Sequence, residues 1–187
     1  MRVKEIAASI LLSLAFLTPV TVGQTTAEEY FNKGIAAYKK GLYDEAIANY
    51  SKTIQLNPRW AEAYCGRGLA HSDKGEYDQA IADYNKALEL KPNYADAYFN
   101  RGIVHDNKGE YDQAISDYNR ALEFNPQRVE VYNNRGYAYF GKGLYDEAIS
   151  DYDRALKIDP TFALAQKNRE FALKAKGEGK QKPSVNP

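Results

Sequence analysis

A 34-residue period runs through most of the chain, and this period constrains the fold more than any other feature. Prolines recur at a constant spacing, at positions 58, 92, 126 and 160. The blocks 27–60, 61–94, 95–128 and 129–162 align beneath one another, with tyrosine at places four, 17 and 24, glycine at place eight and alanine at place 20. A repeat of this length predicts a stack of equal units, each of which buries its apolar face against its neighbours.

Each block has the pattern of two helices. The first helices are expected near 28–40, 62–74, 96–108 and 130–142. A glycine follows each of them (Gly41, Gly75, Gly109 and Gly143), as expected where a helix ends in a residue with positive φ. An aspartate then stands at the N-cap or in the first turn of a second helix (Asp44, Asp78, Asp112 and Asp146). The second helix should stop just before the proline of its block.

These aromatic, glycine, alanine and proline places resemble the tetratricopeptide repeat family. The resemblance covers the four blocks from 27 to 162. It implies an all-α fold, a right-handed α-solenoid of four 34-residue helix-turn-helix repeats. Residues 163–176, with Leu164, Phe171 and Leu173, are interpreted as a C-terminal capping helix. Residues 177–187 are rich in Gly, Lys and Pro and are predicted to form a disordered tail.

Residues 1–23 lie outside the repeat pattern and have the layout of a secretory signal peptide. Arg2 and Lys4 precede an apolar run from Ile6 to Leu17, and small residues follow up to Gly23. The run is short for a membrane span, which needs about 20 apolar residues. We therefore expect an exported protein, periplasmic or secreted, with no membrane insertion after cleavage. The alternatives are an uncleaved anchor and an apolar N-terminus without a targeting role.

Charge and motif content argue against several functions. The chain holds 25 basic and 25 acidic residues, but residues 24–162 hold 17 basic and 22 acidic. An acidic array is the opposite of what nucleic acid requires. His71 and His105 occupy the same place in successive blocks, about one helix-packing distance apart and too far for one metal ion. We expect no catalytic residue, metal or cofactor.

Two further residue sets have open interpretations. Arg67, Arg101 and Arg135 recur at place seven, and Asp83, Asp117 and Asp151 recur at place 23. They predict ion pairs between helices, within a block or across a boundary, unless they are independent solvated charges. The single cysteine, Cys65, is interpreted as a small half-buried residue; a reactive or intermolecular thiol is the alternative.

In tetratricopeptide repeats the first helices line a concave groove, and the resemblance points to places two, five, six, nine, 12 and 13 of each block. Large apolar groups at such places indicate an interaction site. Asparagines at place six resemble the asparagine ladder of O-linked N-acetylglucosamine transferase, which holds a peptide backbone, although Gly66 interrupts the row. The predicted groove residues are Phe31, Asn32, Ile35, Leu69, Phe99, Asn100, Ile103, Asn134 and Tyr137.

The family's two-carboxylate clamp for acidic tails needs lysine at place five. This chain has Phe31, Cys65, Phe99 and Asn133 there, so the clamp is absent. The resulting prediction is a non-enzymatic scaffold that binds a protein, through a peptide or a helix in the groove, in cell-envelope assembly. Two alternatives remain: a structural role by self-association, through the terminal helix or through exposed Trp60, Tyr94 and Phe162, and a cytoplasmic adaptor.

Overall fold

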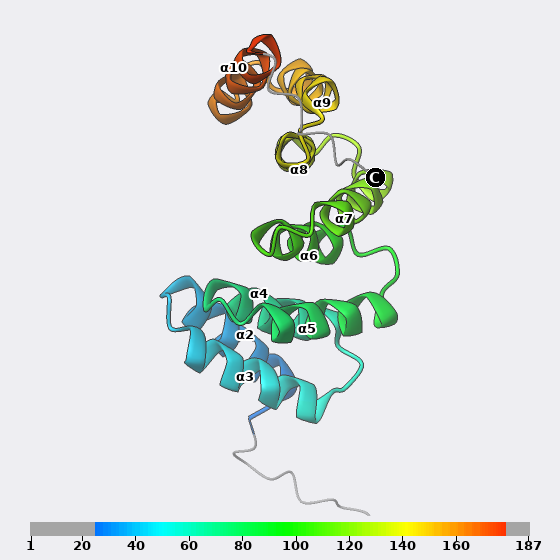
Figure 1. Cartoon of the computed structure of the whole chain (residues 1–187). Helices are drawn as coiled ribbons and strands as arrows, with labels where there is room; N and C mark the ends of the chain where they lie inside the picture. Colours follow the sequence, from blue (N-terminus) through cyan, green and yellow to red (C-terminus); the bar gives the residue numbers. More distant parts are fainter. Residues whose placement is uncertain (1–24, 179–187) are drawn as a thin grey trace, which may run out of the picture.

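A computed structural model describes residues 25–178, and within them the chain is a succession of helices (Figure 1). The first helices of the four repeats are α2 (Ala27–Lys39), α4 (Ala61–Asp73), α6 (Ala95–Asn107) and α8 (Val129–Gly141). The second helices are α3 (Tyr43–Leu56), α5 (Tyr77–Leu90), α7 (Tyr111–Phe124) and α9 (Tyr145–Ile158). The last helix is α10 (Ala163–Gly177). The first helices begin one residue earlier than predicted, and the second helices end two residues before each proline.

The helices stack in order from α2 to α10, so that the two ends of the array lie far apart (Figure 1). The first helices α2, α4, α6, α8 and α10 each contact the next first helix along the array. Within residues 25–178 no second helix contacts the next second helix. The first helices therefore form the inner layer of a curved solenoid, and the second helices form the outer layer.

A tyrosine at place 24 packs against a glycine at place eight in every repeat, and this contact holds each helix pair together. A Cβ atom placed on Gly102 would lie 2.6 Å from Cε1 of Tyr118, and one on Gly136 would lie 2.7 Å from Cε1 of Tyr152. Tyr84, Tyr118 and Tyr152 are almost fully buried. The prediction that small residues let the two helices approach closely is confirmed.

The turn between the helices depends on glycine. Gly41, Gly75, Gly109 and Gly143 have φ between 72° and 77°, a conformation that other residues rarely adopt. The aspartates that follow lie in the first turn of the second helix, where a carboxylate favours the helix dipole. They do not act as N-caps, because other residues hold those positions: Leu42, Glu76, Glu110 and Leu144.

The arginines of place seven form a ladder of ion pairs within the repeats. Arg101 Nε donates to Asp117 Oδ2 at 2.8 Å and Nη2 to Oδ1 at 2.6 Å, while Nη1 reaches Asn85 of the preceding repeat. The pairs Arg67–Asp83 and Arg135–Asp151 repeat this geometry, with Ser51 and Asn119 as the partners across the boundary. Asp117 is only 4% exposed and the side chain of Arg101 is 21% exposed, so these are largely buried pairs rather than solvated charges.

A second ladder, which was not predicted from the sequence, joins each repeat to the next. Lys74 Nζ lies 2.6 Å from Asp44 Oδ1, and Lys108 Nζ lies 2.9 Å from Asp78 Oδ1. The equivalent pairs Lys142–Asp112 and Lys176–Asp146 continue it to α10. In each pair the lysine follows the first-turn aspartate of a second helix by 30 residues in the sequence.

The helix α10 occupies the place of a first helix in an incomplete fifth repeat. Ala165 and Ala172 are buried against the preceding repeat, and Lys176 completes the lysine–aspartate ladder. Leu164, Phe171 and Leu173 are 50%, 55% and 43% exposed, so the expected capping helix keeps an apolar surface. The predicted signal peptide lies outside the described residues, as does the predicted tail apart from Gly177 and Glu178.

Replacing Gly102 with alanine should lower the free energy of unfolding by about 1–3 kcal/mol, because the added methyl group collides with the buried ring of Tyr118. Urea denaturation followed by circular dichroism measures the change. Gly177 is the matched control, because no atom lies within 4 Å of an added Cβ there. Equal effects of the two substitutions would contradict this account of the packing.

Replacing Arg101 with methionine should cost about 3 kcal/mol, because it leaves the buried carboxylate of Asp117 without its main partner. Replacing Arg101 and Asp117 together, with methionine and leucine, should cost less than the two single changes added. The control is the exposed pair Arg120–Glu123, whose coupling should stay within about 0–1 kcal/mol. Additive costs at Arg101 and Asp117 in a double-mutant cycle would show that the pair does not act as a unit.

Candidate functional site

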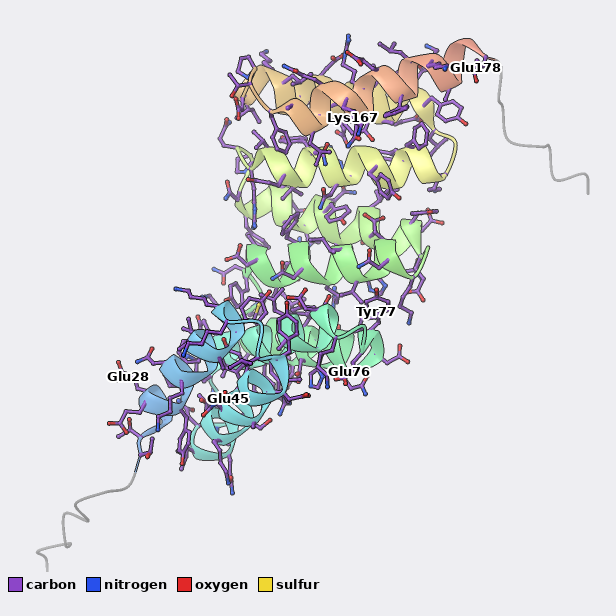
Figure 2. The ribbon with its side chains drawn as sticks, turned by 90° about the vertical axis from the view of Figure 1, so that its left-hand side faces the viewer. Glu28, Glu45, Glu76, Tyr77, Lys167 and Glu178 are labelled. Carbon is purple, nitrogen blue, oxygen red and sulfur yellow. The ribbon has the colours of Figure 1, made fainter. Side chains whose placement is uncertain are left out.

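The inner layer of first helices is the surface on which the predicted groove residues lie. Because these helices contact one another in series, places five, six and nine form rows that run along the whole array. Figure 2 shows side chains along the stacked helices, with Glu28 of α2 near one end and Lys167 of α10 near the other. We call the surface formed by these rows and by place 12 the inner face.

The row at place five closes the boundary between consecutive repeats. Phe31 stacks on Trp60 with ring centroids 4.7 Å apart, and Phe99 lies under the guanidinium of Arg128 at 4.1 Å. In both repeats the partner is the last residue of the block. Trp60, Tyr94 and Phe162 were expected to be exposed at the block ends, and in the structure they are only partly exposed.

Phe99 is the clearest correction to the predicted groove. It is 8% exposed and packs in the core with Tyr118 and Val131, so its ring is not free to meet a partner. Phe31 is partly buried in the same way. The premise that place five is not needed for packing was wrong, because the repeat boundary uses it.

The asparagines at place six lie beside the tyrosines of the preceding repeat. The side chain of Asn134 lies close enough to the Tyr118 hydroxyl to lower its pKa slightly, against the larger rise caused by burial. At the equivalent place in the second repeat a Cβ atom on Gly66 would lie 2.7 Å from Cζ of Tyr50, so the Tyr50 ring fills the space beside this glycine. Asn100 Nδ2 lies 4.0 Å from Cys65 Sγ, and Asn32 is exposed.

One further member of this row was not predicted from the sequence. Asn168 of α10 stands at place six of the incomplete repeat, and its Nδ2 donates to Asn133 Oδ1 at 2.9 Å. The 34-residue spacing from Asn134 to Asn168 was a signal that could have identified it. Amides at this place keep donors and acceptors to offer, since each side chain can make up to four hydrogen bonds.

The row at place nine carries the apolar groups of the inner face. Ile35, Leu69 and Ile103 are partly exposed, and Tyr137 is 52% exposed. Phe171 of α10 continues the row at 55% exposure. The row becomes more aromatic and more exposed towards the C-terminal end of the array.

A cavity of about 200 Å³ lies between α8 and α10 at this end of the inner face. It is lined by Tyr137, Phe140, Tyr152, Asn168 and Phe171. Three of these are the place-nine and place-12 aromatic residues, one is the place-six amide, and Tyr152 belongs to the glycine–tyrosine contact. The cavity is therefore lined by side chains at places that recur in every repeat.

Asp106, at place 12 of α6, is a carboxylate of the inner face with an unusual environment. Its Oδ2 accepts a hydrogen bond from the Tyr118 hydroxyl at 2.7 Å, and its Oδ1 is buried without a hydrogen-bond partner among the described residues. Burial raises the pKa of this carboxyl to about 6, and the bond from Tyr118 only partly opposes the rise. A buried, unpaired carboxylate oxygen costs stability.

Cys65 is buried, and each of the two histidines contacts a glutamate. Cys65 is 6% exposed, more buried than expected, and burial raises the pKa of its thiol to about 11; the reactive thiolate is therefore disfavoured. His71 Nδ1 lies 2.6 Å from Glu76 Oε2, and His105 Nδ1 lies 2.7 Å from Glu110 Oε2. No group of side chains between residues 25 and 178 is arranged to hold a metal ion.

The helices of the described part of the chain are all too short or too polar to cross a membrane. This finding does not reach residues 1–24, where the predicted signal peptide lies.

Comparison with known proteins identifies the architecture. A model of the TPR repeat matches residues 34–75, 71–109 and 107–143, and a model of the tetratricopeptide repeat matches residues 129–162. These matches cover most of the chain, which therefore belongs to the tetratricopeptide repeat family. No curated protein matches the sequence.

Solved structures agree with this assignment. A crystal structure of MamA is 35% identical, with a TM-score of 0.69 over 73% of this chain and 80% of that one. MamA from Desulfovibrio magneticus RS-1, at 23% identity, has the same fold with a TM-score of 0.76 over 82% of this chain and 87% of that one. The first TPR of Spaghetti (RPAP3), bound to the HSP90 peptide SRMEEVD, is 27% identical with a TM-score of 0.61 over 63% of this chain and 93% of that one.

Replacing Asp106 with asparagine should stabilise the protein at pH 7 by about 1 kcal/mol, allowing for solvent screening. The folded-state pKa of about 6 lies above the ordinary value of 3.8, so the ionised carboxylate destabilises the fold above about pH 6. This cost disappears as the pH falls towards 4, and the advantage of asparagine should disappear with it.

Urea denaturation of both proteins at pH 7 and pH 4.5 measures this difference. Asp73, which accepts a hydrogen bond from the Tyr38 hydroxyl at an exposed position, is the matched control. An advantage of Asp106→Asn that is the same at both pH values would contradict the assignment of the cost to the charge.

Proposed function

We propose that this protein is an exported, non-enzymatic scaffold that binds a protein partner on the inner face of its solenoid. Family membership supports the general role, since proteins of this repeat family are interaction scaffolds and one structural relative is bound to a peptide. The observation that carries the proposal is the cavity between α8 and α10, flanked by the exposed rings of Tyr137 and Phe171. Large aromatic groups exposed around a cavity are typical of binding sites.

The groove residues of this proposal are Asn32, Ile35, Leu69, Asn100, Ile103, Asn134 and Tyr137, with Asn168 and Phe171 added from α10. Phe31 contributes through its partly exposed edge, and Phe99 acts only by supporting the boundary beneath them. The apolar row would contact side chains of the partner, while the amide row would hold its backbone. The ligand is an extended peptide or a helix of the partner.

The predicted signal peptide supports the part of the proposal that places the protein in the cell envelope. The basic start, the short apolar run and the small residues of positions 1–23 are the basis of this part of the proposal. Expression of the full chain with a C-terminal tag should give a larger precursor and a smaller exported product on a gel. A single unprocessed product that stays inside the cell would refute export and favour a cytoplasmic adaptor.

Replacing both Asn134 and Tyr137 with alanine should reduce capture of the native partner about tenfold or more while leaving helicity intact, because both side chains are accessible on the inner face. The measurement is crosslinking in the native envelope followed by mass spectrometry. Lys52→Ala combined with Ser116→Ala on the outer helices, both exposed, is the control. Unchanged capture by the inner-face variant would refute the groove assignment.

Self-association is a second candidate, favoured by the apolar surface of α10. Leu164, Phe171 and Leu173 are exposed together on the terminal helix, where a second copy would find an unpaired first helix. Light scattering on the mature chain separates the two candidates. A constant oligomer with a covered inner face would favour self-association.

A further inference from the structure

The cavity between α8 and α10 is large enough for one side chain. Its volume of about 200 Å³ is below the roughly 300–1,000 Å³ of pockets that hold whole small molecules. The rings of Tyr137, Phe140 and Phe171 make it mainly apolar, and the Asn168 amide lies at its edge. An aromatic or large aliphatic side chain of a ligand fits these walls.

The same places one repeat earlier have a different chemistry. Phe140 lines the cavity from place 12 of α8, and Asp106 stands at place 12 of α6. Tyr152 lines the cavity at place 24, and the corresponding Tyr118 donates its hydroxyl to Asp106. The inner face thus presents an apolar position and, next to it, the partly exposed side chain of Asp106. Oδ1 of this carboxylate is buried and has no hydrogen-bond partner in the described residues.

The surrounding charge favours a cation at Asp106. The inner-face places of α2, α4, α6 and α8, including places two and 13 at its edges, carry six carboxylates and one lysine, Lys39. Lys91 and Arg128, from the block ends, pair with three of these carboxylates, and acidic groups stay in excess. On α10 the equivalent places carry Lys167 and Lys174. A positive group of a ligand is therefore attracted towards α6 and repelled from α10.

The distance between the two positions sets the spacing in the ligand. Neighbouring first helices that contact each other lie roughly 8–10 Å apart. An extended chain advances about 3.3 Å per residue. Groups that occupy neighbouring repeats are consequently about three residues apart in an extended peptide.

We propose that the C-terminal half of the inner face recognises an extended peptide with two anchoring side chains. One is a lysine or arginine that lies beside Asp106. The other is an aromatic or large aliphatic residue, about three positions before or after it, that fills the cavity between α8 and α10. This inference rests on the proposed function and specifies its ligand. The cation supplies a positive partner to a carboxylate that has only the Tyr118 hydroxyl. The apolar residue covers Tyr137 and Phe171, which no other part of the described chain covers.

Fluorescence anisotropy with the full chain and labelled dodecapeptides tests the proposal. The host peptides contain Gly, Ser, Ala and Thr, with lysine and phenylalanine three residues apart in either order. Phe171→Ala should weaken binding of the better peptide about tenfold. Leu173→Ala on the same helix, exposed but outside the cavity, should change it less than about twofold.

The cation site is tested by pairing protein and peptide variants. Asp106→Asn should weaken the lysine-containing peptide about fivefold and leave a peptide with glutamine in place of lysine unchanged. Asp73→Asn is the control, because Asp73 also accepts a tyrosine hydroxyl but lies two repeats from the cavity. A peptide with glutamate in place of lysine should bind more weakly than either.

Several results would overturn the inference. Equal effects of Asp106→Asn and Asp73→Asn would do so. The glutamate peptide binding as tightly as the lysine peptide would do so too, as would no measurable binding of either lysine–phenylalanine peptide. A stable oligomer that Phe171→Ala dissociates would assign the cavity to a second copy of the chain. If the Asn134 and Tyr137 double variant still loses its native partner in those cases, the scaffold role stands and only the ligand motif fails.

Discussion

The contact between a place-24 tyrosine and a place-eight glycine is the interaction on which both the fold and the inner face depend. The ring of Tyr118 crosses from the outer helix α7 to the inner helix α6 over Gly102, in a space that leaves no room for a Cβ atom. Its hydroxyl then emerges beside Asp106 and Asn134. One side chain thus closes the helix pair and also sets the polar groups of the surface. A change in the packing of this ring would move the candidate site directly.

Two ladders of charged groups connect successive repeats. The arginine of place seven binds a buried aspartate in its own repeat and a polar side chain of the repeat before it. The lysine–aspartate pairs join successive repeats near the turns. Because a buried ion pair is costly to break and adds little net stability, its main effect is on geometry. The arginine ladder therefore favours one arrangement of consecutive repeats. The lysine–aspartate pairs add less, because their aspartates are 72–88% exposed.

Much of this structure could be predicted from the 34-residue period. The helix pairs, the glycine turns, the close helix approach and the Arg–Asp pairs each need only residues that recur within one block. The lysine–aspartate ladder was also present in the sequence as a recurrent spacing, but it crosses a block boundary and is missed when blocks are read separately. The role of Asn168 was missed for the same reason.

The exposure of the place-five residues could not be predicted, because it depends on the last residue of each block. Phe31 meets Trp60 while Phe99 meets Arg128, and the sequence does not show that these side chains turn towards each other. The cavity between α8 and α10 was also beyond prediction. It requires α10 to stack as a first helix, whereas its glycine place holds Glu170 and its tyrosine place holds Gln166.

The position of α10 has a consequence for how such a protein can change in length. The contacts of α10 with the fourth repeat, through Asn168, Arg169 and Lys176, reuse places that join the other repeats. A duplicated or deleted 34-residue segment would therefore meet polar partners at the same places on both sides, although the place-five contacts differ between boundaries. The length of the array, and with it the number of ligand residues that it spans, is open to alteration by a single in-frame genetic event.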